Sequence, residues 1–182
     1  MYHMLQKNTS LAVASVFFTT PTRDRYLREI SRETGIAHTS VKKELESLVE
    51  KGIIAKRTET RGTREYPVYK ADIHSKDYKR EKRMFNISSI IDSGLVEHVA
   101  SSVMPDTIIL FGSYLLGEDV EDSDIDVFVQ AQEEKIDLEP FERSLGRPIQ
   151  LHFRKDFEEL PGELKNNILN GLPMHGFLEV FE

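Results

Sequence analysis

Two aspartates two positions apart, Asp124 and Asp126, are the residues of this chain best suited to chemistry. They open an apolar run that predicts a β-strand, and alternate residues of a strand point to the same side of a sheet. Neighbouring carboxylates repel each other unless a cation lies between them. The pair therefore predicts a site for a divalent metal ion.

A glycine followed by a serine, Gly112-Ser113, comes shortly before the aspartates and directly after another apolar run. Such a turn offers backbone N–H groups and a hydroxyl to a phosphate. A phosphate site beside a metal site is what phosphoryl or nucleotidyl transfer requires. Acidic residues fill the connection between the two runs, and we expect them to form a solvated loop, with extra metal contacts as the alternative: Glu118, Asp119, Glu121 and Asp122.

These residues resemble the signature of the nucleotidyltransferases. Gly112-Ser113, Gly117 and Ser123-Asp124-Ile125-Asp126 are similar to the pattern G-S-x-x-x-G followed by S-D-x-D, and more narrowly to minimal members of the DNA polymerase β-like superfamily. Residues 145–151 and 164–173 resemble the later part of that domain, so the likeness covers roughly residues 104–180. It implies that Gly112 and Ser113 bind the phosphates of a nucleoside triphosphate. Asp124 and Asp126 would be the catalytic residues that hold Mg²⁺.

The family carries a third carboxylate on the neighbouring strand, and the resemblance places Gln150 at that position. Glutamine is a weak metal ligand and no base at neutral pH. His152 lies two residues further along the same predicted face and is the alternative ligand or proton acceptor. The alternative is that His152 has only a structural role, as a histidine hydrogen-bonded within the sheet. Nucleotide binding is therefore better supported than catalysis.

The first part of the chain predicts helices over residues 9–20, 25–34 and 39–51, then a hairpin of strands over 53–58 and 65–70. This order resembles a winged helix-turn-helix, and the likeness covers about residues 8–72. Ala37 stands where the family usually has a serine or threonine that caps the helix. We expect Thr39 or Ser40 to provide that cap.

The resemblance implies that the third helix enters the major groove of double-stranded DNA. Phosphate contacts from basic side chains would give affinity for DNA without recognising its base sequence. The candidate contact residues lie at the start of this helix and on the hairpin: His38, Thr39, Ser40, Lys42, Lys43, Arg57, Arg61 and Arg64. A module for protein docking or dimerisation is the alternative.

Charge is divided unequally along the chain. Residues 1–83 hold 18 Lys and Arg against 11 Asp and Glu, whereas residues 84–182 hold 6 against 20. The asymmetry favours a basic module for an anionic partner joined to an acidic one. Solvated faces are the simpler alternative. We expect the later basic residues to be surface charges: Arg143, Arg147, Arg154 and Lys155.

The 182 residues allow one large or two small domains, and the absence of cysteine excludes disulfides and thiolate metal sites. No apolar run reaches the length of a signal peptide core or a membrane span, so we expect a cytoplasmic protein without a membrane partner.

The predicted fold class is α+β with two domains. A winged helix-turn-helix occupies residues 1–74, linking helices occupy 75–103, and a minimal nucleotidyltransferase fold, a mixed sheet with flanking helices, occupies 104–182. In the last we expect strands near 107–111, 124–129 and 148–153, and helices near 113–116, 137–145 and 163–170.

The expected function is transfer of a nucleoside monophosphate from Mg-NTP, such as Mg-ATP, to a hydroxyl acceptor on a protein or small molecule, coupled to DNA binding. The alternative is a catalytically impaired domain that serves as nucleotide sensor or dimerisation body of a transcriptional regulator. Winged-helix proteins are commonly two-fold dimers, so we expect a homodimer.

Overall fold

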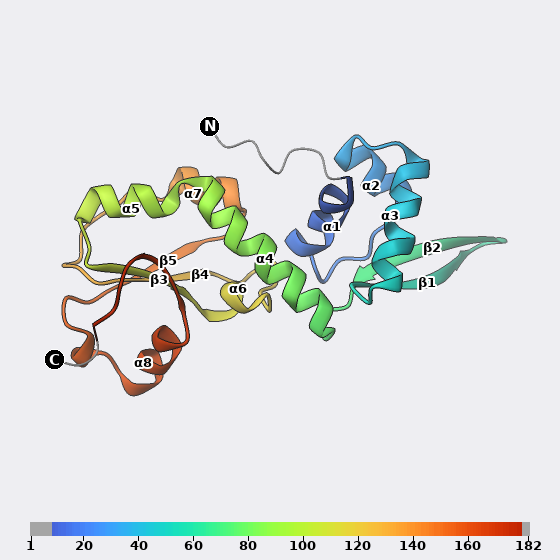
Figure 1. The fold of residues 1–182 in the computed structure, drawn as a ribbon. Helices are drawn as coiled ribbons and strands as arrows, with labels where there is room; N and C mark the ends of the chain where they lie inside the picture. Colours follow the sequence, from blue (N-terminus) through green and yellow to red (C-terminus); the bar gives the residue numbers. More distant parts are fainter. Residues whose placement is uncertain (1–8, 180–182) are drawn as a thin grey trace. The chain divides into compact units, whose positions relative to one another are not determined.

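The structure is a computed structural model that describes residues 9–179, except for the side chain of Arg61. It is a mixed α+β structure whose residues form two compact units, divided between Lys82 and Arg83 (Figure 1). Helix α4 (Lys76–Ser93) crosses this division. No helix in the described part of the chain is both long and apolar enough to span a membrane.

The first unit contains the three predicted helices and the predicted hairpin. In chain order they are α1 (Thr9–Thr19), α2 (Leu27–Thr34), α3 (His38–Glu50), β1 (Ile54–Arg61) and β2 (Arg64–Ala71). The buried residues of α3 recur at helical spacing, with Val41, Leu45 and Leu48 on one face. They share the first unit's interior with residues such as Phe17 and Ile30. One apolar stripe on α3 therefore leaves its opposite face in solvent.

The hairpin is anchored at the end nearest the helices. β1 and β2 pair antiparallel along their full length, and only the last part of β2 is buried. Arg25, between α1 and α2, exchanges two backbone hydrogen bonds with Tyr69 of β2, with N···O distances of 2.8 and 2.9 Å. Its buried guanidinium also donates to Glu29 and Glu33 of α2, at 3.1 and 2.9 Å. The connection before α2 is thus tied to both the hairpin and the helix.

The predicted cap of α3 is wrong. The helix begins at His38, so Ala37 is its N-cap and no side chain caps it. Thr39 and Ser40 already lie inside the first turn of the helix. A capping residue needs a non-helical backbone just outside the helix, and neither residue has that position.

The second unit is a four-stranded sheet with helices on both faces. Its elements after α4 are α5 (Leu95–Val103), β3 (Thr107–Phe111), α6 (Gly112–Leu116), β4 (Ile125–Val129), α7 (Glu139–Leu145), β5 (Ile149–Phe153), the short 3-10 helix η1 (Phe157–Glu159), α8 (Gly162–Leu169) and β6 (Leu172–Gly176). The strand order is β5-β4-β3-β6. β4 and β5 are parallel and the other pairs antiparallel, which confirms the predicted mixed sheet.

Strand β6 was not predicted from the sequence. It pairs antiparallel with β3 at the edge of the sheet, with a register irregularity between Ile108 and Ile109. Pro173 and Gly176 weaken its strand signal, because proline cannot donate to the ladder and glycine has no side chain to pack. Both residues are tolerated at an edge, where one side of the strand has no partner.

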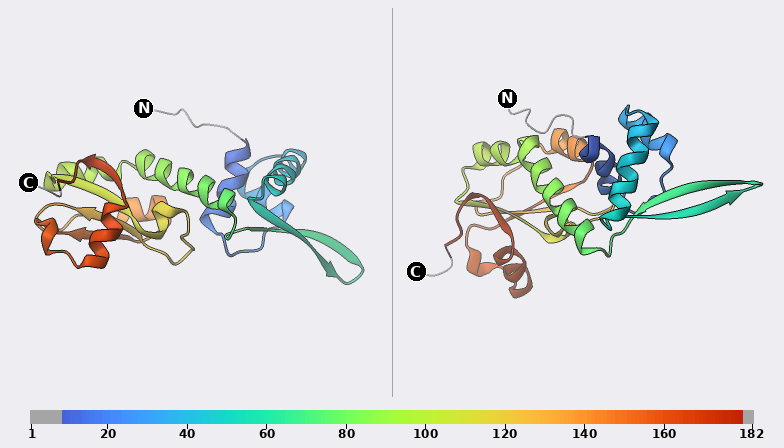
Figure 2. Two further views of the ribbon diagram at one scale, coloured as in Figure 1. Left: turned by 60° about the horizontal axis from the view of Figure 1, so that its bottom comes forward. Right: turned by 45° about the vertical axis from the view of Figure 1, so that its right-hand side comes forward.

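The two faces of the sheet have separate apolar cores. Ile108 and Leu110 of β3 face a core that includes Leu95 and Val99 of α5. Ile109 and Phe111 of β3 and Phe128 of β4 face the side where α8 and η1 pack. Helices α5 and α7 lie on one face and α8 on the other (Figures 1 and 2). The segment predicted to link the domains therefore contributes α5 to the core of the second unit.

Candidate functional site

The Gly-Ser turn and the second aspartate are neighbours in the sheet. Phe111, the last residue of β3, pairs with Asp126 of β4, so the turn that follows lies beside the Asp126 carboxylate. Gly112 has φ +76°, and a Cβ added there would lie 2.5 Å from Oδ2 of Asp126. Only glycine permits both this backbone conformation and the close approach of the carboxylate.

Asp126 has a histidine partner. Nε2 of His152 lies 3.0 Å from Oδ1 of Asp126, and both side chains are about one-quarter exposed, at 23% and 26%. The imidazole also stacks at a tilt against Phe111, with ring centroids 5.2 Å apart. Gln150 occupies the register position beside Asp126 on β5 and is exposed. His152, two residues along the strand, is the side chain that makes the polar contact.

Asp124 lies one residue before β4, which begins at Ile125 and not at residue 124 as predicted. Its side chain is exposed and has no hydrogen bond or ion pair with the residues that the structure describes. Across residues 9–179 there is no cluster of three His, Asp or Glu side chains that could hold a metal ion. A metal ion at this site would need further ligands in addition to the carboxylates of Asp124 and Asp126.

This donor set fits magnesium bound together with a nucleotide. Mg²⁺ prefers oxygen ligands and commonly uses one or two carboxylates, with substrate phosphates and waters completing the coordination. Asp124 and Asp126 supply the carboxylates. Ser113, half-buried in the first turn of α6, makes no side-chain hydrogen bond within the described part of the chain. Its hydroxyl is therefore available to a phosphate oxygen.

Two charges that we expected to be solvated are buried instead. The side chain of Asp119 is 1% exposed and that of Arg147 is 8% exposed, and their closest N···O distance is 3.5 Å. Nδ2 of Asn86 also donates to Oδ1 of Asp119 at 2.8 Å. Burial, together with the charge of Asp119, raises the pKa of the nearby Tyr114 phenol. Buried charges need such partners, and these lie about 30 residues away along the chain, where no local pattern could reveal them.

The predicted DNA-contact residues at the start of α3 share one property, which is exposure to solvent. They are His38, Thr39, Ser40, Lys42 and Lys43. Lys42 lies 3.9 Å from Glu46, one turn further along the helix, and both side chains remain more than half exposed. An ion pair this exposed is weak, so it leaves Lys42 able to contact another anion.

The hairpin residues differ from one another. Arg64 is exposed, whereas Arg57 forms an ion pair with Asp24 at 2.5 Å. The side chain of Arg61 lies outside the described residues. Two further arginines that were not predicted as contact residues, Arg28 and Arg32, are exposed and four residues apart on α2. That spacing puts them on one face of the helix, and helical periodicity was the signal available to find them.

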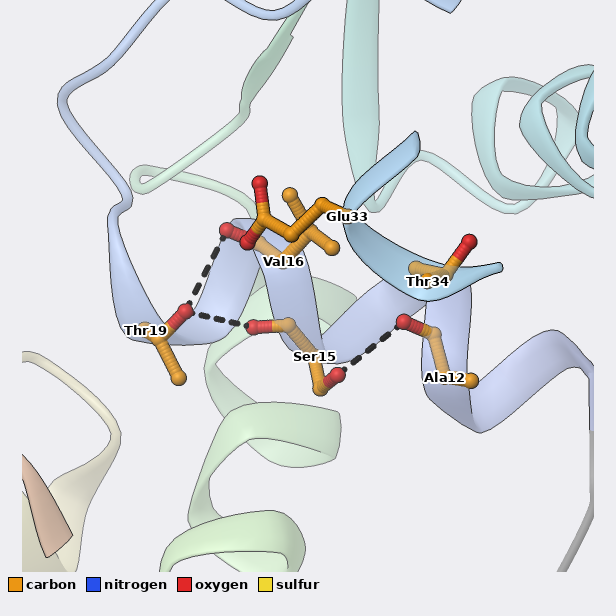
Figure 3. Close-up of a pocket in the computed structure, with 6 residues that line it drawn as sticks. All are labelled: Ala12, Ser15, Val16, Thr19, Glu33 and Thr34. Atoms are coloured by element: carbon orange, nitrogen blue, oxygen red, sulfur yellow. Dashed lines mark hydrogen bonds between the residues drawn. The ribbon is translucent and has the colours of Figure 1, made fainter. Parts of the chain in front are cut away.

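A surface hollow of about 330 Å³ lies between α1 and α2, and none of the predicted site residues lines it (Figure 3). Its hydroxyl groups are used by the helices themselves. Ser15 donates to the carbonyl of Ala12 at 3.0 Å, Thr19 to that of Ser15 at 3.0 Å, and Thr34 to that of Ile30 at 2.8 Å. The hollow therefore has no set of convergent polar groups for a ligand.

Comparison with known proteins bears on the second unit. Residues 93–175 match the family model of the nucleotidyltransferase domain. No curated protein matches the chain. A solved structure described as a possible transcriptional regulator from Methanosarcina mazei Go1 is 21% identical, covering 53% of this chain and 78% of its own, with a TM-score of 0.38. The similarity to the nucleotidyltransferase domain thus lies in the second unit, and the matched residues include all the candidate site residues on β4, α6 and β5.

Proposed function

We propose that the second unit binds a nucleoside triphosphate with Mg²⁺ and transfers the nucleoside monophosphate to a hydroxyl acceptor on a protein or small molecule. The observation that carries this proposal is the contact of the Asp126 carboxylate with the Gly112 turn. A metal ion held by the Asp126 carboxylate would neutralise charge on a bound phosphate only if the phosphate-binding turn lies beside that carboxylate, as it does here.

Each side chain has a role in this proposal. Ser113 and the backbone N–H groups of its turn bind phosphate oxygens, while Asp124 and Asp126 hold the metal ion. When bound, Mg²⁺ neutralises the charge that develops on the transferred phosphoryl group and the leaving pyrophosphate. His152, with Nε2 protonated, donates to Oδ1 of Asp126 and fixes the direction of that carboxylate.

A second candidate function rests on Gln150, which lies in register with Asp126 where the family carries a carboxylate. Losing a general base lowers the rate by about 10²–10⁴-fold. A site with this defect can still bind Mg-NTP through the remaining groups. The second candidate is therefore a nucleotide sensor that controls a DNA-binding transcriptional regulator.

We propose that the first unit is a winged helix-turn-helix that binds double-stranded DNA as part of a homodimer. The exposed first turns of α3, with Lys42 and Lys43, support this role, as does the bridge that ties the hairpin to the connection before α2. Arg28 and Arg32 of α2 add candidate phosphate contacts. Arg57 would have to leave Asp24 to reach a phosphate.

The proposal is tested by incubating the protein with labelled NTP, Mg²⁺ and candidate acceptors. Asp124→Asn should abolish labelled product, because it removes one metal ligand. Asp122→Asn is the matched control, since Asp122 is exposed and precedes Asp124 by two residues. Product that is equal in the wild type and in Asp124→Asn would exclude the proposed metal site. Calorimetric binding of Mg-ATP without product would favour the sensor.

A further inference from the structure

A buried polar cluster lies behind the candidate site. We define it as Asn86 of α4, Asp119 of the connection between α6 and β4, and Arg147 of the connection between α7 and β5. We propose that these three are positioning residues that hold the Gly-Ser turn and the loop before Asp124 in the arrangement that nucleotide binding needs. This inference rests on the proposed function of the second unit.

Asn86 fixes the short helix that carries the turn. Its side-chain nitrogen, Nδ2, donates both to the carbonyl of Tyr114 and to Oδ1 of Asp119, each at 2.8 Å. Tyr114 belongs to α6, which has only five residues. A helix of this length is not stable by itself, because nucleation is unfavourable and few hydrogen bonds follow. The amide of Asn86 therefore supplies a tertiary anchor one residue after Ser113.

Arg147 restrains the same loop from the side of β5. It donates to the carbonyl of Gly146 at 3.1 Å, while its other terminal nitrogen faces Asp119. The next residue, Pro148, accepts a backbone hydrogen bond of 2.8 Å from Ile125 of β4. Separating a buried carboxylate from its partners is strongly unfavourable. Asp119 thus connects α4, the acidic loop and the entry to β5 at one point.

The acidic residues between α6 and β4 differ in burial and therefore in the role that each can have. Asp119 is buried and each of its carboxylate oxygens faces a protein donor, so it is not placed to act as a metal ligand. Asp122 and Asp124 follow in the same run and are exposed. Asp119 therefore acts through the position of the loop, whereas Asp124 faces solvent where a nucleotide would bind.

The test combines two measurements on the full chain. Amide hydrogen exchange without nucleotide reports whether residues 112–118 loosen, and calorimetry with Mg-ATP reports the consequence for binding. Asn86→Ala and Asp119→Asn should each speed exchange over 112–118 and raise the Kd for Mg-ATP, both by about tenfold, as expected from losing one buried hydrogen bond. Asp119→Asn keeps the shape of the side chain, so it remains informative if Asn86→Ala fails to fold.

Asp122→Asn removes a charge from the same loop and should change neither quantity. Equal acceleration of exchange across the whole second unit, or none over 112–118, would overturn the positioning role. Faster local exchange with an unchanged Kd would overturn its link to nucleotide binding. If the wild type binds no Mg-ATP, the proposed function fails, and hydrogen exchange still decides whether the cluster holds the turn.

Discussion

The candidate binding residues of the two units use charge in opposite ways. The basic side chains proposed to contact DNA lie on the surface of the first unit, and the ion pairs of Lys42 and Arg57 are more than a third exposed on both sides. In the second unit, Asp119 and Arg147 are buried and Asp126 is one-quarter exposed, each with a specific partner. Exposed charges act additively and are screened by salt, whereas buried ones depend on single neighbours. We therefore expect graded effects from the exposed basic residues of the first unit and large single-residue effects at the candidate site of the second.

The largest effect should come from Gly112→Ala. The new methyl group would meet Oδ2 of Asp126 at 2.5 Å and displace the carboxylate. Misplacing a reacting or binding group by about 1 Å can cost about 100-fold, so we expect the Kd for Mg-ATP to rise by that order. Titration calorimetry on the wild type and the variant measures this Kd.

Gly146→Ala is the control for Gly112→Ala. Gly146 has a similar φ of +66°, but nothing lies within 4 Å of an added Cβ. Both variants should lose about 1–2 kcal/mol of unfolding free energy from the left-handed backbone. Only Gly112→Ala should lose nucleotide binding. Equal Kd values for the two variants would contradict the role of the close approach.

A smaller effect should come from His152→Ala. Partners that orient a metal-binding carboxylate typically contribute about 10–100-fold to metal affinity or activity. We expect the Kd for Mg-ATP to rise within this range, measured by calorimetry at constant pH. His175→Ala, on the exposed edge strand β6, should have no effect. An unchanged Kd in His152→Ala would mean that its contact with Asp126 is only structural.

In the first unit, Lys42→Ala combined with Lys43→Ala should weaken duplex binding in a graded way. Each phosphate contact contributes about 0.9 to the slope of log K against log salt, so the slope should fall by about 2. Fluorescence anisotropy over a range of salt concentrations measures it. Lys51→Ala, at the other end of α3, is the charge-matched control. A slope that does not change would favour a protein-docking role for this unit.

The smallest effect concerns Tyr114 at alkaline pH. Burial, followed by the charge of Asp119, raises the pKa of the phenol above its ordinary value of about 10. The folded state then favours the protonated form, so this contribution to stability is complete below pH 10 and lost as pH rises above it.

We expect Tyr114→Phe to lose less unfolding free energy than the wild type between pH 8 and pH 11, measured by urea denaturation. Tyr66→Phe, at an exposed position of the hairpin, should behave like the wild type. Identical losses in the wild type and Tyr114→Phe would contradict the burial argument.

Local patterns predicted most of the elements that carry the site. The apolar runs around Gly112 and Asp126 gave β3, α6 and β4 to within one or two residues, because strand alternation and glycine turns are properties of short segments. The burial of Asp119 could not be predicted, since it depends on Asn86 and Arg147 from distant segments. The contact between His152 and Asp126 could not be predicted either, because it depends on the register in which β4 and β5 pair.

We propose that Asp126 and the Gly112-Ser113 turn form one site for a magnesium-bound nucleotide. Titration calorimetry with ATP, with and without Mg²⁺, on the wild type and Asp126→Asn tests it most directly. We expect saturable binding that requires Mg²⁺ in the wild type and is weakened by at least about 100-fold in a folded Asp126→Asn variant. Binding of equal strength in both proteins, or no binding by the wild type, would contradict it.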